Sequence, residues 1–284
     1  MKLDDLQRIY GAAGHELRIL LLSIDLSTFD GAKAEEIKRK ARRIITYLNG
    51  VSGRWTRQTT KVAYEKAAEK AKDQLWRLGR RIPRGKLPAR SGPGVVEETA
   101  DTALLKATGS IMHTVEQFVS AALMGTSATK SIVGAVQEFD YQDIDLEVAL
   151  LARQAVKQEW SRSVLKKAIM DRLRQLVSDE NFIQIGSRTY NLRKYAEMVS
   201  RTTFRQAQTQ ATRDQCARYE SDLVEVSYHG TDCEICLEYE GKVFSLSGND
   251  ANYPILDEEP PFHPNCKHSI LPTSEEALST REHE

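Results

Sequence analysis

The chain has 284 residues, of which 40% are hydrophobic and 28% charged, and its formal net charge is zero. This length allows one large domain or two ordinary ones, and the composition is typical of a soluble, helix-rich protein. The sequence contains no run of about 18 apolar residues and no signal-peptide pattern at its start. We therefore expect a protein made in a reducing cytoplasm, where cysteines are thiols or metal ligands before they are disulfides.

Three helices are predicted in the first part of the chain, because apolar residues recur there at three- and four-residue spacing. The second runs over about 37–48 and the third over about 54–78, with a turn predicted at LNGVSG, residues 48–53. These two helices would form an α-hairpin. The stripe of the first helix consists of Leu6, Ile9, Tyr10, Ala13, Leu17, Leu20 and Leu21.

A stretch with three prolines and four glycines, residues 79–94, predicts a linker or long loop. Helical periodicity resumes over about 100–122, and GTS at 125–127 indicates a helix end followed by a new N-cap. A short helix to about Phe139 and a long helix from about 143 to Val177, passing through Trp160, are expected next.

The pattern changes after residue 181. Two short β-favouring runs within 182–192 predict a hairpin, 192–220 predicts a helix, and two strands are expected within 222–230 and 241–248. The predicted fold class is mainly α, with a helical N-terminal region and a small α+β, loop-rich C-terminal module that zinc would staple. The predicted segments are a basic helical region (1–90), a helical region (91–181) and the module (182–284).

Charge is distributed unevenly. Residues 33–90 hold 18 Lys and Arg against 5 Asp and Glu, whereas residues 219–284 hold 3 against 15. A basic helical stretch is either a solvated helix face or a surface for nucleic acid or an acidic protein. The candidate DNA-binding residues are Lys38, Arg39, Lys40, Arg42, Arg43, Arg54, Arg57, Lys61, Arg80, Arg81, Arg84 and Lys86.

Three of the four cysteines and three of the six histidines lie in two short stretches, 229–236 and 263–268. The two-residue gap between Cys233 and Cys236 is that of a metal knuckle, and HPNCKH adds further ligands at short spacing. The candidate ligands of a structural Zn²⁺ are Cys233, Cys236, Cys266 and either His263 or His268, with His229 a further candidate.

Other interpretations of this cluster stay open. Cys233 or Cys236 would pair with Cys266 in an oxidising exterior, or the residues form a hydrogen-bonded turn around Pro264. A zinc-dependent enzyme or nuclease-like effector would need an open metal position and a basic approach surface, which the acidity of 219–284 disfavours. No catalytic residue is predicted, and Cys216 is interpreted as a packing residue of its helix.

The C-terminal third resembles the minor capsid, or minor head, proteins of tailed phages, both the Mu F-like head morphogenesis group and the phage minor capsid protein 2 group. The resemblance covers roughly residues 185–272. It rests on Tyr195, Met198, Arg201 and Thr202 of a helix, on the Cys233 and Cys236 pair, on Gly241-Lys242-Val243, and on His263-Pro264-Asn265-Cys266. His268 matches the second group, whereas the first often has Cys there.

The resemblance implies a virion protein, located at the portal vertex or in the capsid interior, that acts in head assembly and in DNA packaging or ejection. It implies as partners the phage portal protein, major capsid or scaffold proteins and genomic double-stranded DNA, and no membrane. The basic stretch at 33–90 is compatible with DNA contact, because packaged DNA presents a dense phosphate surface. The apolar helical stripes of the N-terminal region would equally suit docking on a helical portal subunit.

Overall fold

The computed structural model describes residues 3–130 and 143–281. The chain is mainly α-helical with a few short strands, which confirms the predicted fold class. Within these residues, no helix combines the length and the apolar character needed to cross a membrane.

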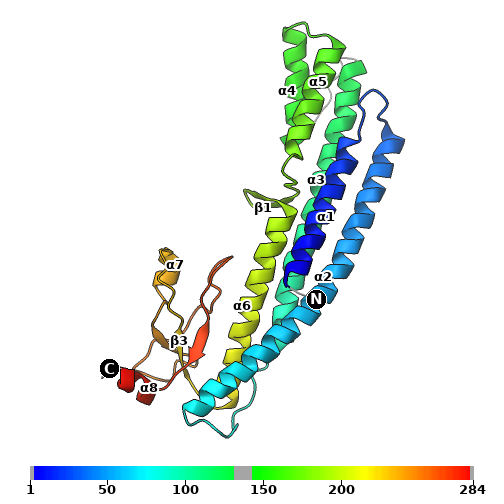
Figure 1. Ribbon diagram of the computed structural model, residues 1–284. Coiled ribbons are helices and arrows are strands. Elements are labelled where there is room, and N and C mark those ends of the chain that lie inside the picture. Colours follow the sequence, from blue (N-terminus) through cyan, green and yellow to red (C-terminus); the bar gives the residue numbers. More distant parts are fainter. Residues whose placement is uncertain (1–2, 131–142, 282–284) are drawn as a thin grey trace. The chain divides into compact units, whose positions relative to one another are not determined.

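Long helices account for most of the chain (Figure 1). They are α1 (Leu3–Leu22), α2 (Gly31–Arg77), α3 (Pro93–Lys130), α4 (Asp143–Lys157), α5 (Arg162–Leu176) and α6 (Leu192–Arg218), with the short α7 (Glu234–Leu237) and α8 (Glu275–Arg281). The strands are β1 (Ile183–Ile185), β2 (Arg188–Tyr190), β3 (Leu223–Val226), β4 (Val243–Ser245) and β5 (Ile270–Pro272). The predicted helix ending near Phe139 extends into residues outside the described ranges.

The chain divides into two compact units. One, here called the helical unit, comprises Asp5–Val51 and Leu104–Ala196. The other, here called the sheet unit, comprises Met1–Asp4, Ser52–Ala103 and Glu197–Glu284. Helices α2, α3 and α6 contribute residues to both units. The division into segments 1–90, 91–181 and 182–284 stays a prediction.

Apolar stripes of several helices form the core of the helical unit. Each fully buried side chain of this kind contributes about 1.5–3 kcal/mol relative to an exposed one. The chain itself covers these stripes. They are therefore not free to dock on a portal subunit, which is the use that the sequence had suggested for them. Fully buried members are Leu6, Tyr10, Leu17, Leu21, Leu48, Ile111 and Phe118.

The prediction of a turn at 48–53 is wrong: α2, which is 47 residues long, continues through these residues and forms no hairpin there. Leu48 and Val51 are buried, so the three- and four-residue spacing of apolar residues persists across the glycines. Asn49 accepts a hydrogen bond of 2.8 Å from the hydroxyl of Thr108 on α3. Burial and this contact outweigh the helix-propensity cost of a glycine, which is about 1 kcal/mol.

The helix break predicted at 125–127 is also wrong, because α3 continues to Lys130. A Cβ at Gly125 would lie 2.9 Å from Cγ2 of Ile169 on α5. Gly125 is therefore a contact position, where the lack of a side chain lets α5 approach α3 closely.

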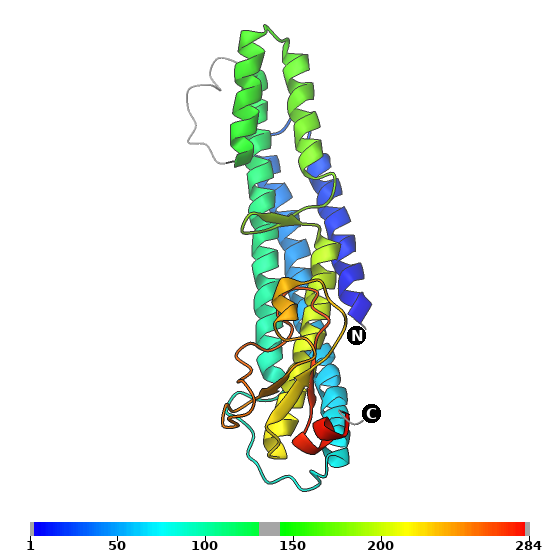
Figure 2. The same cartoon turned by 90° about the vertical axis from the view of Figure 1, so that its left-hand side faces the viewer.

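The single long helix predicted through Trp160 is two helices, α4 and α5, which lie side by side (Figures 1 and 2). Glu159 has a left-handed backbone with φ of 54°, and the N–H of Trp160 donates to the carbonyl of Ala155 at 2.9 Å. Ser161 then caps α5 by accepting from the N–H of Val164. Apolar periodicity alone does not reveal such a reversal.

The hairpin predicted within 182–192 is confirmed as the antiparallel pair β1–β2, which turns at Gly186 with φ of 59°. Its first strand is attached to α3, where the hydroxyl of Ser110 accepts from the N–H of Gln184 at 2.7 Å. The hydroxyl of Thr114 donates to the carbonyl of Phe182 at 3.1 Å.

The sheet unit contains an antiparallel sheet in the order β4–β3–β5. The two predicted strands are β3 and β4, with Val224 opposite Phe244, and the third, β5, places Pro272 opposite Val224. Strand β5 was not predicted, because Ile270–Pro272 is three residues long and follows a loop-like stretch. This sheet carries the loops that bear the cysteine and histidine cluster.

The sheet packs on the last turns of α6 through a core that includes Cys216, Val224, Val226, Phe244 and Ile270. Burial raises the pKa of the Cys216 thiol to about 12. Cys216 is therefore a packing residue, as predicted.

The predicted loop between α2 and α3 is confirmed, and it is attached to the end of α6. The N–H groups of Arg84 and Gly85 donate to the carbonyl of Arg218 at 3.1 and 3.0 Å. A Cβ at Gly85 would lie 2.0 Å from the carbonyl oxygen of Ala217, so only glycine fits this approach.

Candidate metal centre

The first two cysteines lie at the start of α7, which follows β3 and a short loop. Cys233 is the N-cap residue and Cys236 lies within the helix, so one turn brings both thiols to the same side. A hydrogen bond from the backbone N–H of Cys236 lowers the pKa of Cys233. Burial, followed by the charge of Cys266, raises the pKa of Cys236 to about 12.

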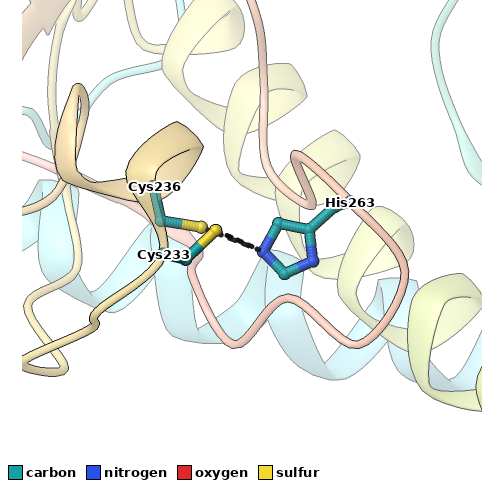
Figure 3. A group of neighbouring side chains, drawn as sticks. All are labelled: Cys233, Cys236 and His263. Atoms are coloured by element: carbon teal, nitrogen blue, oxygen red, sulfur yellow. Dashed lines mark hydrogen bonds between the residues drawn. The ribbon is translucent and has the colours of Figure 1, made fainter.

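The HPNC stretch brings His263 to this pair (Figure 3). Nε2 of His263 lies 3.5 Å from Sγ of Cys233 and 3.1 Å from Sγ of Cys236. Asn265 has φ of 67°, and the N–H of Cys266 donates to the carbonyl of His263 at 3.1 Å. Asparagine tolerates this left-handed backbone better than most residues, so the turn suits its sequence.

A second group of three shares Cys236 with the first. Sγ of Cys266 lies 3.9 Å from Sγ of Cys236 and 3.4 Å from Nδ1 of His268. Cys236, Cys266 and His268 are all buried. The structure therefore brings together all five residues that the sequence analysis proposed as ligands.

The cluster can hold a metal ion. A tetrahedral zinc with Zn–S distances of about 2.3 Å and Zn–N distances of about 2.1 Å separates two sulfurs by about 3.8 Å and a sulfur and a nitrogen by about 3.6 Å. The separations of 3.9 Å for Cys236–Cys266, 3.5 Å for Cys233–His263 and 3.4 Å for Cys266–His268 are close to these values. The donor set of thiols and imidazoles is that of structural zinc sites.

A disulfide is not formed by these cysteines, all of which are free thiols. The 3.9 Å between Sγ of Cys236 and Sγ of Cys266 is well beyond the S–S bond length of about 2.05 Å.

Glu240, which the sequence analysis missed, completes the site. Its carboxylate accepts from the backbone N–H groups of His229 and Thr231, the latter at 3.1 Å, and lies 3.1 Å from Nε2 of His268. Burial opposes ionisation, but these hydrogen bonds prevail and lower the pKa of Glu240 to about 2. No residue-spacing rule identifies a carboxylate that supports a ligand rather than binding the metal.

His229 belongs to the surroundings of the site and to neither group of three. Its Nε2 lies 3.0 Å from Oγ of Ser227, and its ring contacts that of His268 edge-on at 5.1 Å. Burial, then the neighbouring His268, lowers the pKa of His229.

Three thiols and two imidazoles exceed the four ligands that a tetrahedral ion needs. A catalytic zinc site usually has three protein ligands and one open position, whereas a structural site is closed. The number and softness of these ligands thus favour a structural centre.

The proposed DNA-binding residues lie on α2 and on the loop that follows it, and all are exposed except the half-buried Lys38. In the helical unit, Lys38 and Lys40 pair with Glu35 and Glu36 at 2.9 and 2.7 Å. Arg42 lies 3.9 Å from Glu116. Arg39 and Arg43, one helical turn apart, form no ion pair with any described residue.

In the sheet unit, Arg54, Arg57 and Lys61 share one face of α2, and Lys61 lies 3.9 Å from Glu65. Arg80, Arg81, Arg84 and Lys86 lie beyond the end of the helix. From Arg57 to Arg77 the helix rises about 30 Å, and the exposed Lys66, Lys70 and Arg77 lie along this stretch, between the two sets of proposed residues.

Comparison with known proteins gives one family. A sequence model of the family described as phage minor capsid protein 2 matches residues 31–283. No curated protein matches the chain, and no solved structure does.

Proposed function

This chain belongs to the phage minor capsid protein 2 family, and on that premise we propose that it acts at the portal vertex or in the capsid interior during head assembly and DNA packaging or ejection. Membership supports a structural protein of the phage head and a location in the virion. The observation that carries the proposal is the extent of the match, which includes most of both units and not only the cysteine and histidine cluster.

DNA contact is the second element of the proposal. Arg39, Arg43, Arg80, Arg81 and Arg84 are exposed and form no ion pair with other described side chains. Such cations bind phosphates by releasing counterions, without reading the base sequence. This mode of binding suits a protein that meets packaged genomic DNA at arbitrary sequence.

Protein partners would be the portal protein and the major capsid or scaffold proteins. The acidic C-terminal part, residues 219–284, favours a basic protein surface over DNA as the partner of the sheet unit's loops. Rim charges of this kind direct association and orientation more than they add affinity.

Zinc is the third element, in a structural role. The module around the cluster is rich in loops and has a small core, so a bound ion would supply folding free energy that apolar burial does not. Cys233, Cys236, Cys266 and one of the two histidines would hold the ion, drawn from the two groups of three that share Cys236.

Purified phage particles test the assignment. Quantitative mass spectrometry should find the protein in DNA-filled heads at a few copies per particle, and cross-linking should join it to the portal. A phage with an early stop codon in this gene should produce heads that are misassembled or lack DNA. If the protein is absent from particles and remains free in lysates, the head assignment is wrong.

A further inference from the structure

Glu240 connects the two halves of the metal cluster. Its side chain is 3% exposed, and its carboxylate holds the backbone N–H groups of His229 and Thr231 together with the ring of His268. The hydroxyl of Thr231 in turn accepts from the N–H of Cys233 at 3.2 Å. One buried carboxylate therefore orients both His268 and the loop that leads to the cysteine pair.

This contact determines which nitrogen of His268 is available. Both oxygens of the Glu240 carboxylate already accept from backbone N–H groups, so Nε2 of His268 is the donor in the contact between them. In the neutral ring, Nδ1 is then unprotonated, and it points at Sγ of Cys266 at 3.4 Å. A carboxylate in this position fixes the tautomer of a ligand histidine and raises its basicity.

His263 is supported differently. Its Nδ1 lies 2.9 Å from the carbonyl oxygen of Pro264, the next residue in the same turn, and its ring is only partly buried. His268 is buried with both thiols of its group, and its support is anchored to a separate loop. The ring of His268 is therefore held more rigidly in a ligand position than the ring of His263.

We propose that His268, through Nδ1, is the histidine ligand that completes a zinc site with Cys233, Cys236 and Cys266, and that Glu240 is its positioning residue. The inference rests on the proposed structural zinc. It assigns no bond to Glu240 itself, which acts through His268.

The substitution Glu240→Gln tests the positioning role. The amide can donate to Nε2 of His268, which moves the ring proton to Nδ1 and blocks the ligand nitrogen. Loss of such supporting contacts typically costs 10- to 100-fold in metal affinity. The matched control is Glu238→Gln, at an exposed glutamate two residues away whose carboxylate forms no hydrogen bond or ion pair with the described residues.

Metal binding is measured on the full-length chain, reduced and freed of metal. Titration with Co²⁺ reports tetrahedral thiolate coordination by its visible spectrum, and competition against a chromophoric chelator gives the Zn²⁺ affinity. We expect one ion per wild-type chain, affinity lowered about 10- to 100-fold in E240Q, and wild-type affinity in E238Q. His268→Asn should lose the site, whereas His263→Asn should retain the Co²⁺ spectrum.

A rescue separates positioning from a general loss of folding. His268→Cys should supply a ligand that has no second nitrogen to orient. Its Sγ lies one bond closer to the backbone than Nδ1 of histidine, which the longer Zn–S bond partly offsets. Affinity in the double variant E240Q/H268C should therefore equal that of H268C alone. Circular dichroism of each variant checks that the fold is kept.

The possible failures are distinguishable. If the wild-type chain binds no zinc, the proposal of a structural zinc site is wrong, and so is the assignment of His268 and Glu240. If the wild-type chain binds zinc but E240Q binds as tightly, or if H263N rather than H268N loses the site, the zinc stands and the assignment of His268 and Glu240 is overturned. If E240Q/H268C binds zinc more weakly than H268C, Glu240 does not act through His268 and its positioning role is overturned.

Discussion

The hydroxyl of Tyr64 on α2 donates a hydrogen bond of 2.5 Å to Oδ2 of Asp214 on α6, 150 residues further along the chain. Asp214 is fully buried and also accepts from the N–H of Gly92 at 2.7 Å and from the side chain of Gln210 at 2.9 Å. Three elements of the sheet unit thus converge on one carboxylate. Burial, then the hydrogen bond to Asp214, raises the pKa of Tyr64.

Replacing Tyr64 by phenylalanine should lower the free energy of unfolding by about 1.5–3 kcal/mol, the usual contribution of a hydrogen bond to a charged group. The measurement is the urea midpoint. Tyr47→Phe is the control, because Tyr47 is 60% exposed and its change should stay within about 0.5 kcal/mol. Equal shifts in the two variants would mean that the Asp214 contact contributes nothing.

Two glycines of α3 should respond to alanine with opposite signs. Gly125→Ala should destabilise by about 1–3 kcal/mol, because the new methyl group would meet Ile169 at 2.9 Å. Gly109 has open space around it, so Gly109→Ala should stabilise by about 0.5–1 kcal/mol through helix propensity. Thermal unfolding of the two variants makes the comparison, and a stabilising Gly125→Ala would contradict the close approach of α5.

Asp222 should make stability depend on pH. Burial raises its pKa, but hydrogen bonds from Ser245 and Ser247 outweigh burial and lower it overall. Because the folded-state pKa lies below the unfolded value of about 3.9, the stabilisation is complete above that value and is lost as pH falls below it. The stability difference between wild type and Asp222→Asn should therefore shrink as pH falls below about 3.9.

The control for this pH profile is Asp73→Asn, at an exposed aspartate on α2 with no hydrogen bond or ion pair to the described residues. Urea unfolding at each pH gives both differences. A difference for Asp222→Asn that stays constant with pH would show that its hydrogen bonds do not favour the ionised form.

Removal of zinc should loosen the C-terminal module. At free zinc about 100 times Kd, binding to the folded state adds about 2.7 kcal/mol, so a chelator should lower the unfolding temperature and expose residues 227–269 to protease. A Cys233→Ser/Cys236→Ser variant should show no response to the chelator. Identical protease maps with and without chelator in the wild-type chain would refute a stabilising ion.

Salt dependence should distinguish free from paired cations in DNA binding. Neutralising Arg80, Arg81, Arg84 and Lys86 should weaken binding at any DNA sequence and reduce the slope of log K against log salt by up to about four. Arg39→Gln/Arg43→Gln should weaken binding more than Lys38→Gln/Lys40→Gln, because these lysines already pair with Glu35 and Glu36. Fluorescence anisotropy at several salt concentrations measures both, and a slope unchanged by every variant would argue against phosphate contact.

The sequence alone identified features that depend on local spacing. Apolar periodicity located α1, α6 and most of α3, and Gly186 marked the hairpin, because helix faces and tight turns are encoded within a few residues. The two-residue spacing within Cys233–Cys236 and within His263–Cys266 likewise predicted a cluster, and the structure brings these four residues together.

Tertiary contacts decided the rest. The glycines at 50, 53 and 125 had predicted helix breaks, yet α2 and α3 are continuous through them. The apolar area buried against neighbouring helices outweighs the helix-propensity cost of a glycine, which is about 1 kcal/mol. The support that Glu240 provides to His268 joins residues 28 positions apart, which no local pattern signals. The spacing of cysteines and histidines in the sequence indicated the candidate ligands. The contact of Glu240 with His268 could not be predicted in this way, because it depends on how β3, α7 and β5 are connected in space.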